Sequence, residues 1–345
     1  VSAEKMREII ADIPDGSYSA EDYMDSDGII DEPLTIDLDM VVEGDAMTVD
    51  FSGSSLPCEG PVNSVPSTSK SAVFIALKHM FPEIPMSSGI FEPVDIELTE
   101  ESFLHAKEPS PVAGCAAETS QRIVDTYLSA ISKSSPDRAN GNPFGTIMNY
   151  SMGGDDPEDE VDEDYVMYQF CGGGYGGFEG GDGLTHGAPS ISIANAQPIE
   201  ILENKYPIRY ERWGINEESE GPGRWRGGFG SEHRLTLQRG SASASVLGDR
   251  AKFAPQGFAG GDNAETAHVE FDVDGETVVP EHGSKVAGVR LSAGDEIVLQ
   301  IPGGGGYGDP HDRPVERVKA DVERDLISRE RARERYGVHI SDDGS

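Results

Sequence analysis

The first 81 residues show three clear patterns of apolar and polar positions. Residues 34–52 alternate between the two on either side of Gly44-Asp45, which predicts a β-hairpin with its turn at those residues. Residues 2–13 and 67–81 place apolar side chains three or four positions apart, which predicts one amphipathic helix in each range. The first part of the chain therefore mixes helices with strands.

The strongest helical signal lies further along, and it predicts a helix at about residues 117–134. Its single apolar face is made of Ile123, Val124, Tyr127, Leu128 and Ile131. Pro136 then ends the helix, because proline cannot donate the next backbone hydrogen bond. We expect this helix to pack its apolar face into a core and to present its first turn to a site.

Strand patterns dominate the second half of the chain. Short apolar runs separated by turn residues fill most of residues 165–300, and one of them contains the hairpin signal Asp274-Gly275. A charge run at 155–164 lies between two predicted strands and reads as a solvated loop. After Pro310, a heavily charged stretch keeps a narrow apolar seam, which predicts a tail helix.

These elements predict an α+β fold. We expect a mixed lobe at residues 1–150, a β-rich lobe at 151–310, and a charged tail helix with a frayed end at 311–345. At 345 residues the chain is long enough for more than one hydrophobic core.

The charge balance is strongly acidic, with 63 Asp and Glu against 27 Lys and Arg, for a formal net charge of −36. Nucleic acids and anionic membranes attract proteins through basic patches, so neither is expected as a partner. Because the acidic residues run through every segment, we interpret the surface as adapted to high salt and expect a haloarchaeal source. An acidic protein of ordinary habitat is the alternative.

Diluting KCl is expected to weaken the far-UV circular dichroism signal of the protein. At roughly 1 M salt the screening length is about 3 Å, so the repulsion between carboxylates that opposes folding is largely removed. At low salt this repulsion returns. An unchanged spectrum after dilution would show that the surface is not adapted to salt.

Cysteine content and hydropathy indicate the cellular compartment in which the protein is expected. Cys58, Cys115 and Cys171 are odd in number and unclustered, so no disulfide framework or metal knuckle can be built from them alone. There is no run of 18 apolar residues and no basic leader followed by an apolar stretch. We therefore expect a soluble, cytoplasmic protein.

Two glycine-rich runs formally fit a dinucleotide-binding spacing, one at Gly172, Gly174 and Gly177 and one at Gly303, Gly305 and Gly308. Neither opens a helix, as a dinucleotide site requires. Two interpretations are left open: glycine allows close backbone packing where strands end, or the backbone amides are presented to a ligand.

The first turn of the central helix holds the strongest group of polar residues, Glu118, Thr119, Ser120, Gln121 and Arg122. Free amides at a helix start favour an anionic or carbonyl ligand, and these side chains offer directed hydrogen bonds. Equally, Thr119 or Ser120 could cap the helix while the others face solvent. Asn63, Asn149 and His186 are weaker candidates, because turn amides and single histidines are more often structural.

Eight segments together resemble the hydantoinase B/oxoprolinase family, in family order from about Ala3 to Pro310. They include the segments at residues 60–78, 117–131, 146–154, 171–177, 201–230 and 301–310. This family contains the B-type subunits of N-methylhydantoinases, part of 5-oxoprolinases, and α subunits of acetone and acetophenone carboxylases.

The resemblance implies a B-type subunit of an ATP-dependent cyclic amide hydrolase. A separate A-type subunit would use ATP to phosphorylate the carbonyl oxygen of a small cyclic amide, and the B-type subunit would complete hydrolysis in a hetero-oligomer. Carried over by motif, Glu118 to Arg122 would be catalytic, and Asn63, Asn149, Gly172, Gly173, Gly174 and His186 would bind substrate.

Two departures from the family pattern qualify this expectation. The family's N-terminal portion, with a His/Asp motif resembling the carboxylase metal site, is absent, so we expect an N-terminally truncated chain whose divalent metal, Mn or Zn, would belong to the missing part. Cys115 also stands where relatives usually have glycine or asparagine. The alternatives are a carboxylase-like α subunit or a non-catalytic, truncated assembly partner.

Overall fold

The computed structural model describes residues 1–158 and 164–341, which form two compact units, Val1–Ala139 and Asn140–Ser345. The boundary between the two units therefore falls near residue 139, whereas we expected the first lobe to end at residue 150. The predicted loop at 155–164 lies partly outside the described residues. The α+β class is confirmed.

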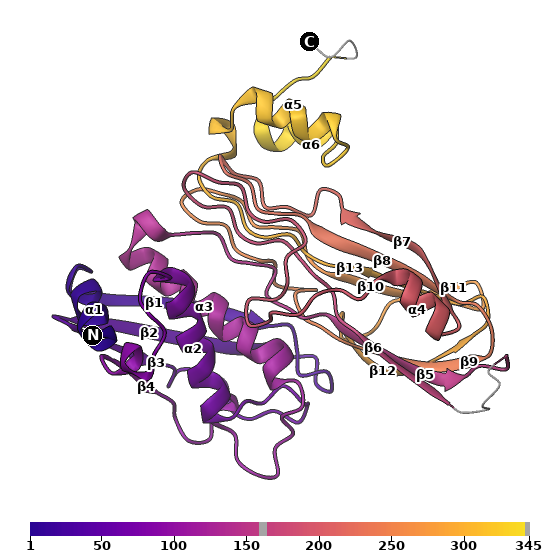
Figure 1. Cartoon of the computed structure of the whole chain (residues 1–345), viewed down its shortest axis with the longest axis horizontal. Helices are drawn as coiled ribbons and strands as arrows, with labels where there is room; N and C mark the ends of the chain where they lie inside the picture. Colours follow the sequence, from indigo (N-terminus) through magenta and orange to yellow (C-terminus); the bar gives the residue numbers. More distant parts are fainter. Residues whose placement is uncertain (159–163, 342–345) are drawn as a thin grey trace. The chain divides into compact units, whose positions relative to one another are not determined.

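The first unit is a four-stranded sheet with helices on one face (Figure 1). Its strand order is β1-β2-β3-β4, antiparallel except for the parallel pair β3 and β4. The elements are α1 (Ser2–Ala11), β1 (Gly16–Met24), β2 (Leu34–Glu43), β3 (Ala46–Asp50), α2 (Pro66–Met80), η1 (Ser88–Phe91), β4 (Val94–Glu97), η2 (Phe103–His105), η3 (Cys115–Thr119), α3 (Ser120–Ser134) and η4 (Pro136–Arg138).

The predicted hairpin and the three predicted helices of this unit are confirmed. In β2 and β3 the inward positions, such as Ile36, Leu38 and Val49, are buried, and the strands turn at Gly44-Asp45. Helix α3 buries Ile123, Val124, Tyr127 and Ile131 as its apolar face predicts. Burial on this scale contributes about 1.5 to 3 kcal/mol for each large apolar side chain.

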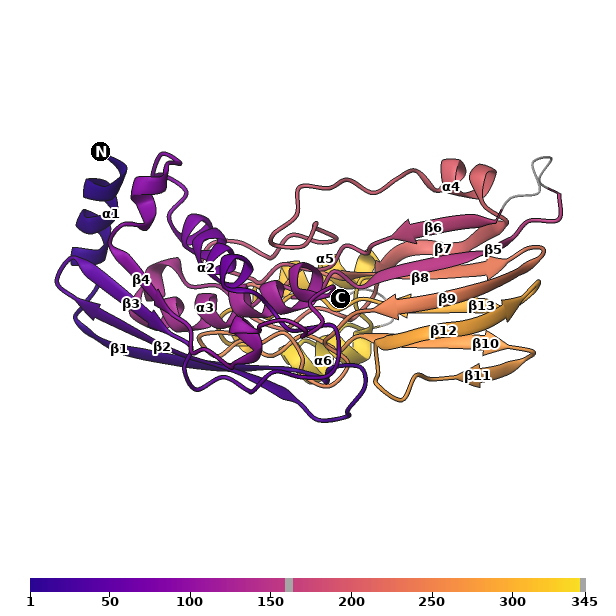
Figure 2. The same ribbon diagram turned by 90° about the horizontal axis from the view of Figure 1, so that it is seen from below.

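The second unit contains two sheets, with strand orders β11-β10-β13-β8-β7 and β12-β9-β5-β6. Their strands are β5 (Asn149–Asp155), β6 (Tyr165–Gln169), β7 (Ile208–Asn216), β8 (Gly230–Leu237), β9 (Ser241–Leu247), β10 (His268–Val273), β11 (Glu276–Val278), β12 (Lys285–Ser292) and β13 (Glu296–Gln300). The two sheets form separate layers in Figure 1 and overlie one another in Figure 2, and one buried core draws side chains from both, including Met152 and Val246 from one and Leu235 and Leu299 from the other.

Beyond the sheets, extended glycine-rich segments run side by side toward the chain's C-terminal helices (Figure 1). The run after β13 shows how they are joined, because Gly304, Gly305 and Gly306 each donate a backbone hydrogen bond to a different segment. The acceptors are the carbonyls of Gly228, Asn142 and Asp262, at 3.0, 2.8 and 2.9 Å. In an extended helix of the polyproline II type, with about three residues per turn, successive residues point in different directions. Their backbone hydrogen bonds are therefore expected to reach different neighbouring segments.

The tail differs from the single helix that we predicted. It contains η5 (Pro310–Asp312), α5 (Val315–Glu323) and α6 (Arg329–Tyr336), while α4 (Ile199–Lys205) lies earlier in the unit. The chain leaves the helical conformation after Glu323, where Asp325 takes a positive φ of 55°. Val318, Ile327, Ala332 and Tyr336 then form a small core with Phe229.

Candidate functional site

The predicted site residues fall into two groups, one in each unit. Asn63 and the segment Glu118–Arg122 belong to the first unit, whereas Asn149, Gly172–Gly174 and His186 belong to the second.

The chain enters α3 through a π-helical turn, η3, which the sequence analysis did not predict. The amide of Glu118 donates to the carbonyl of Gly114 at 2.9 Å, and the amide of Ser120 donates to that of Cys115. The amides of Glu118 and Ser120, which we expected to be free, are thus already bonded, because the hydrogen-bonded ladder begins upstream. The alternative in which Thr119 or Ser120 caps the helix is not met either, since Thr119 makes no side-chain capping bond and the Ser120 hydroxyl donates to a carbonyl of the preceding turn. Single π-turns occur frequently at functional sites.

Most side chains of this turn are used within the first unit, and all five are buried. Thr119 donates its hydroxyl hydrogen bond to the carbonyl of Val62, and Ser120 donates to the carbonyl of Ala116 at 2.7 Å. Arg122 lies 3.4 Å from a carboxylate oxygen of Asp22 and 3.3 Å from one of Asp125, and all three side chains are buried. These groups hold the turn in place.

Gln121 is the exception in this turn. Its side chain is fully buried, and in the described part of the chain neither its Nε2 nor its Oε1 has a hydrogen-bond partner. Leaving a buried polar group unsatisfied costs about 1 to 3 kcal/mol, and such groups in native proteins usually mark a water, an ion or a functional role. Gln121 therefore offers one donor and one acceptor that the fold itself does not use.

Asn63 has a different environment, because its amide is saturated by the loop around it. Its Oδ1 accepts from the Cys58 amide at 2.9 Å, and its Nδ2 donates to the carbonyls of Cys58, Gly60 and Pro111. These bonds fix the loop that also supplies the acceptor for Thr119. The structure thus gives Asn63 a positioning role beside the turn.

Asp27 secures the same loop and was missed by the sequence analysis. One carboxylate oxygen accepts from the amides of Ile29 and Ile30, and the other accepts from those of Glu59 and Gly60 at 3.0 and 2.9 Å. Burial alone would raise the pKa of Asp27, but the four backbone bonds outweigh burial and hold it below its usual value. The only sequence signal was an acidic residue in a turn-forming Asp-Ser-Asp-Gly stretch.

Substituting Asp27→Asn is expected to lower the free energy of unfolding by about 1 to 3 kcal/mol at neutral pH, because the amide cannot accept all four bonds. A lowered carboxyl pKa stabilises the fold above the unfolded-state pKa, near 3.8, and this contribution disappears as pH falls through the folded-state pKa. The urea stabilities of the two proteins should therefore begin to converge as pH falls below about 4 and should meet only once pH is below the folded-state pKa of Asp27. Exposed Asp95→Asn is the control, and a loss of stability equal to that control would contradict the assignment.

In the second unit, the structure brings Gly172 and His186 together. A Cβ placed on Gly172 would lie only 2.7 Å from Cδ2 of the His186 ring, so glycine is required for this contact. The His186 side chain is exposed, its backbone has a φ of 52°, and partial desolvation of the ring lowers its pKa, so the ring is neutral at pH 7. The amides of Gly173 and Gly174 donate to Gly187 and Pro302. Close packing of neighbouring atoms explains why glycine occupies positions 172, 173 and 174.

Asn149 begins β5, and its side chain donates to the carbonyl of Leu247 on the neighbouring strand at 2.9 Å. Its role in substrate binding stays a prediction. Over the described ranges, 1–158 and 164–341, no group of three or more His, Cys, Asp or Glu could hold a metal ion. In the same ranges, no helix combines the length and apolar character needed to cross a bilayer.

Comparisons with known proteins agree with this architecture. The hydantoinase B/oxoprolinase family model matches residues 1–310. The beta subunit of the caprolactamase of Pseudomonas jessenii is 29% identical over 98% of this chain and 59% of its own length. A protein of Pseudomonas sp. strain NS671, provisionally named as the B-type subunit of a D-/L-hydantoinase, is 28% identical over 99% of this chain and 58% of its own length.

Two solved structures show the same fold. The ATP-dependent caprolactamase of Pseudomonas jessenii superposes with a TM-score of 0.88 at 27% identity, covering all of this chain and 60% of that one. Nucleotide-free acetone carboxylase superposes with a TM-score of 0.85 at 18% identity, covering 52% of its chain. The chain thus spans between half and two thirds of these relatives, and it belongs to the hydantoinase B/oxoprolinase family.

Proposed function

We propose that the chain is a B-type subunit of an ATP-dependent cyclic amide hydrolase and works with an A-type partner in the cytoplasm. The observation that carries the proposal is the match to the beta subunit of a caprolactamase over 98% of the chain. The ATP dependence stated for the caprolactamase structure supports the same reaction type. Over one turnover, the ring amide, one ATP and two waters would give an open-chain acid, ADP and phosphate.

The chemistry requires activation before hydrolysis. An amide carbon is a poor electrophile until its oxygen carries a good leaving group, and phosphorylation by the A-type partner would provide one. The B-type subunit would then hold the activated ring, stabilise charge that develops on the oxygens, and deliver water. Preorganised donors in a dry site are effective in this role, because they need not reorient during the reaction.

Gln121 is the residue of this chain that we assign to substrate. Its unused amide can donate to a developing oxyanion through Nε2 and can orient a water through Oε1. Thr119, Ser120 and Arg122 would act indirectly as positioning residues, because their side chains are bonded within the unit. Asn149 and His186 remain proposed substrate contacts.

The resemblance implied a divalent metal, Mn or Zn, held by the family's N-terminal portion, and the described residues do not supply a ligand set for one. No step assigned to this chain therefore passes through a metal. Acetone carboxylase shares the fold, but at 18% identity it shows the fold alone. The carboxylase function is accordingly the weaker interpretation.

The test is reconstitution with an A-type partner. The native complex should open at least one of hydantoin, N-methylhydantoin, 5-oxoproline and caprolactam in an ATP-dependent reaction. Bicarbonate-dependent ATP consumption with a ketone would indicate a carboxylase. If the assembled complex turned over none of these amides, the proposal would be wrong.

A further inference from the structure

A second polar site lies in the first unit, where the parallel strands β3 and β4 end. Helix α2 connects these strands, so the three elements form a crossover whose carboxyl edge is open. In open α/β sheets, ligands bind outside the carboxyl ends of the parallel strands, and β3 and β4 form the parallel pair of this otherwise antiparallel sheet. A pocket of about 450 Å³ lies at this edge, which is a typical size for a small-molecule site.

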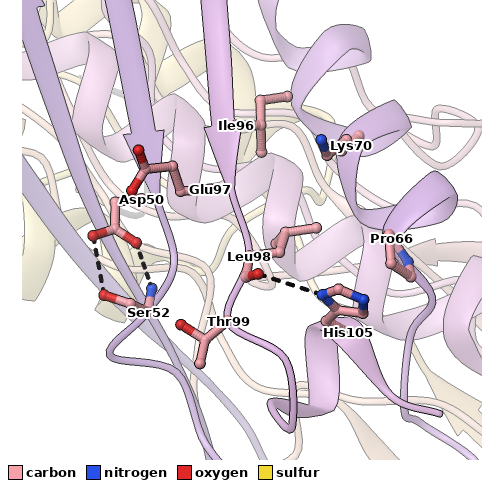
Figure 3. Close-up of a pocket in the computed structure, with 9 residues that line it drawn as sticks. All are labelled: Asp50, Ser52, Pro66, Lys70, Ile96, Glu97, Leu98, Thr99 and His105. Atoms are coloured by element: carbon pink, nitrogen blue, oxygen red, sulfur yellow. Dashed lines mark hydrogen bonds between the residues drawn. The ribbon is translucent and has the colours of Figure 1, made fainter.

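Opposite charges line the two sides of this pocket (Figure 3). Asp50 and Glu97, the last residues of β3 and β4, lie on the strand side, and Lys70 of α2 and His105 lie on the helix side. Ile96 and Leu98 lie between these two pairs. The pocket is therefore anionic at one side, cationic at the other and apolar between them.

The two groups best placed for a ligand are not paired with each other or with another side chain. Within residues 1–158 and 164–341, neither Lys70 nor Glu97 forms a side-chain hydrogen bond or ion pair. In contrast, Asp50 accepts from the amide and hydroxyl of Ser52 at 2.8 and 3.0 Å, and His105 donates from Nδ1 to the carbonyl of Leu98 at 3.3 Å. Asp50 and His105 are thus held in position by the fold.

We propose that this pocket binds a small zwitterion with an ammonium group at one end, a carboxylate at the other and methylenes between them. The ammonium would meet Glu97 and Asp50, the carboxylate would meet Lys70, and the methylenes would cover Ile96 and Leu98. The ligand choice rests on the proposed function, since opening a simple lactam produces an ω-amino acid of this form.

The same chemistry separates the possible substrates. Opening a hydantoin gives an N-carbamoyl amino acid, which has no ammonium group for the acidic side of the pocket. Opening 5-oxoproline gives glutamate, whose second carboxylate would face Asp50 or Glu97. The pocket therefore favours the lactam branch of the family, with the open-chain product as its ligand.

Titration calorimetry with the full chain tests this assignment without ATP or a partner. The probes are 4-aminobutanoate, 5-aminopentanoate and 6-aminohexanoate, with hexylamine, hexanoate and N-carbamoylglycine for comparison. At least one ω-amino acid should bind saturably and more tightly than all three comparison compounds. Measurements belong at the lowest KCl concentration that preserves the folded spectrum, because salt screens these contacts.

Variants with matched controls locate the binding. Lys70→Met and Glu97→Gln should each weaken binding about fivefold, as expected for loss of one exposed ion pair. Lys5→Met and Glu8→Gln, exposed on α1, make the same charge changes away from the pocket and should leave binding unchanged. Absence of saturable binding, equal binding of hexylamine or hexanoate, or equal effects of the control variants would overturn the proposal. Turnover by the reconstituted complex is a separate readout, so failure here leaves the proposed function standing.

Discussion

Replacing Gly227 by alanine is expected to destabilise the second unit by at least about 3 kcal/mol, the upper end of ordinary overpacking. A Cβ at this position would lie 1.8 Å from the carbonyl oxygen of Gly304 and 2.5 Å from its carbonyl carbon. Both atoms belong to the backbone of a neighbouring glycine-rich segment, so no side-chain rotation can relieve the clash. Thermal unfolding followed by near-UV circular dichroism would measure the loss.

Gly214→Ala is the matched control for this prediction. Gly214 lies in β7, where the nearest atom to an added Cβ is Nε of the Arg212 side chain at 3.7 Å, an ordinary contact distance. Its substitution should change stability by less than about 1 kcal/mol, the usual scale of a strand glycine. Equal destabilisation by the two variants would show that close backbone packing is not what requires glycine at residue 227.

The second large effect is expected at Gln121. Substitution Gln121→Leu removes the unused amide while nearly preserving side-chain volume, so the fold should be as stable as wild type or slightly more stable. Turnover of the activated amide should nevertheless fall by about 100-fold or more, the range measured when one oxyanion donor is removed. The rate of ring opening by the reconstituted complex, measured at saturating ATP, gives this comparison.

Ser132 provides the control for Gln121. It lies on the same helix, is fully buried, and its hydroxyl is also without a partner in the described part of the chain. Ser132→Ala should leave turnover unchanged. If Gln121→Leu kept full activity, or lost activity only in proportion to a loss of folded protein, the assignment of Gln121 to substrate would be wrong.

Local periodicity was enough to predict much of the fold. The hairpin of β2 and β3 and the helices α2 and α3 follow from apolar spacing alone, although α3 is buried on nearly every side and not only along its apolar face. The π-turn before α3 was not predictable in this way, because it depends on how residues 114–120 meet the loop at Val62. The break between α5 and α6 was missed because the narrow apolar seam of this charged stretch continues through it.

The candidate site was predicted less well, for a related physical reason. Sequence identifies polar residues but does not show which of them the fold has already satisfied. Asn63 and Thr119 resembled ligand groups until their hydrogen bonds were seen, while Gln121 gained importance because its amide has none. The pocket between Lys70 and Glu97 was missed because it depends on the parallel pairing of β3 with β4, which joins residues about 50 positions apart.

The most direct test of the central claim is the ratio of ADP released to ring opened by the native complex, measured beside the A-type partner alone. If this chain completes the hydrolysis of an activated amide, the complex should open one ring for each ATP consumed. The partner alone should then consume ATP without opening the ring. Ring opening at the same rate by the partner alone would contradict the account, because this chain would then have no part in the chemistry.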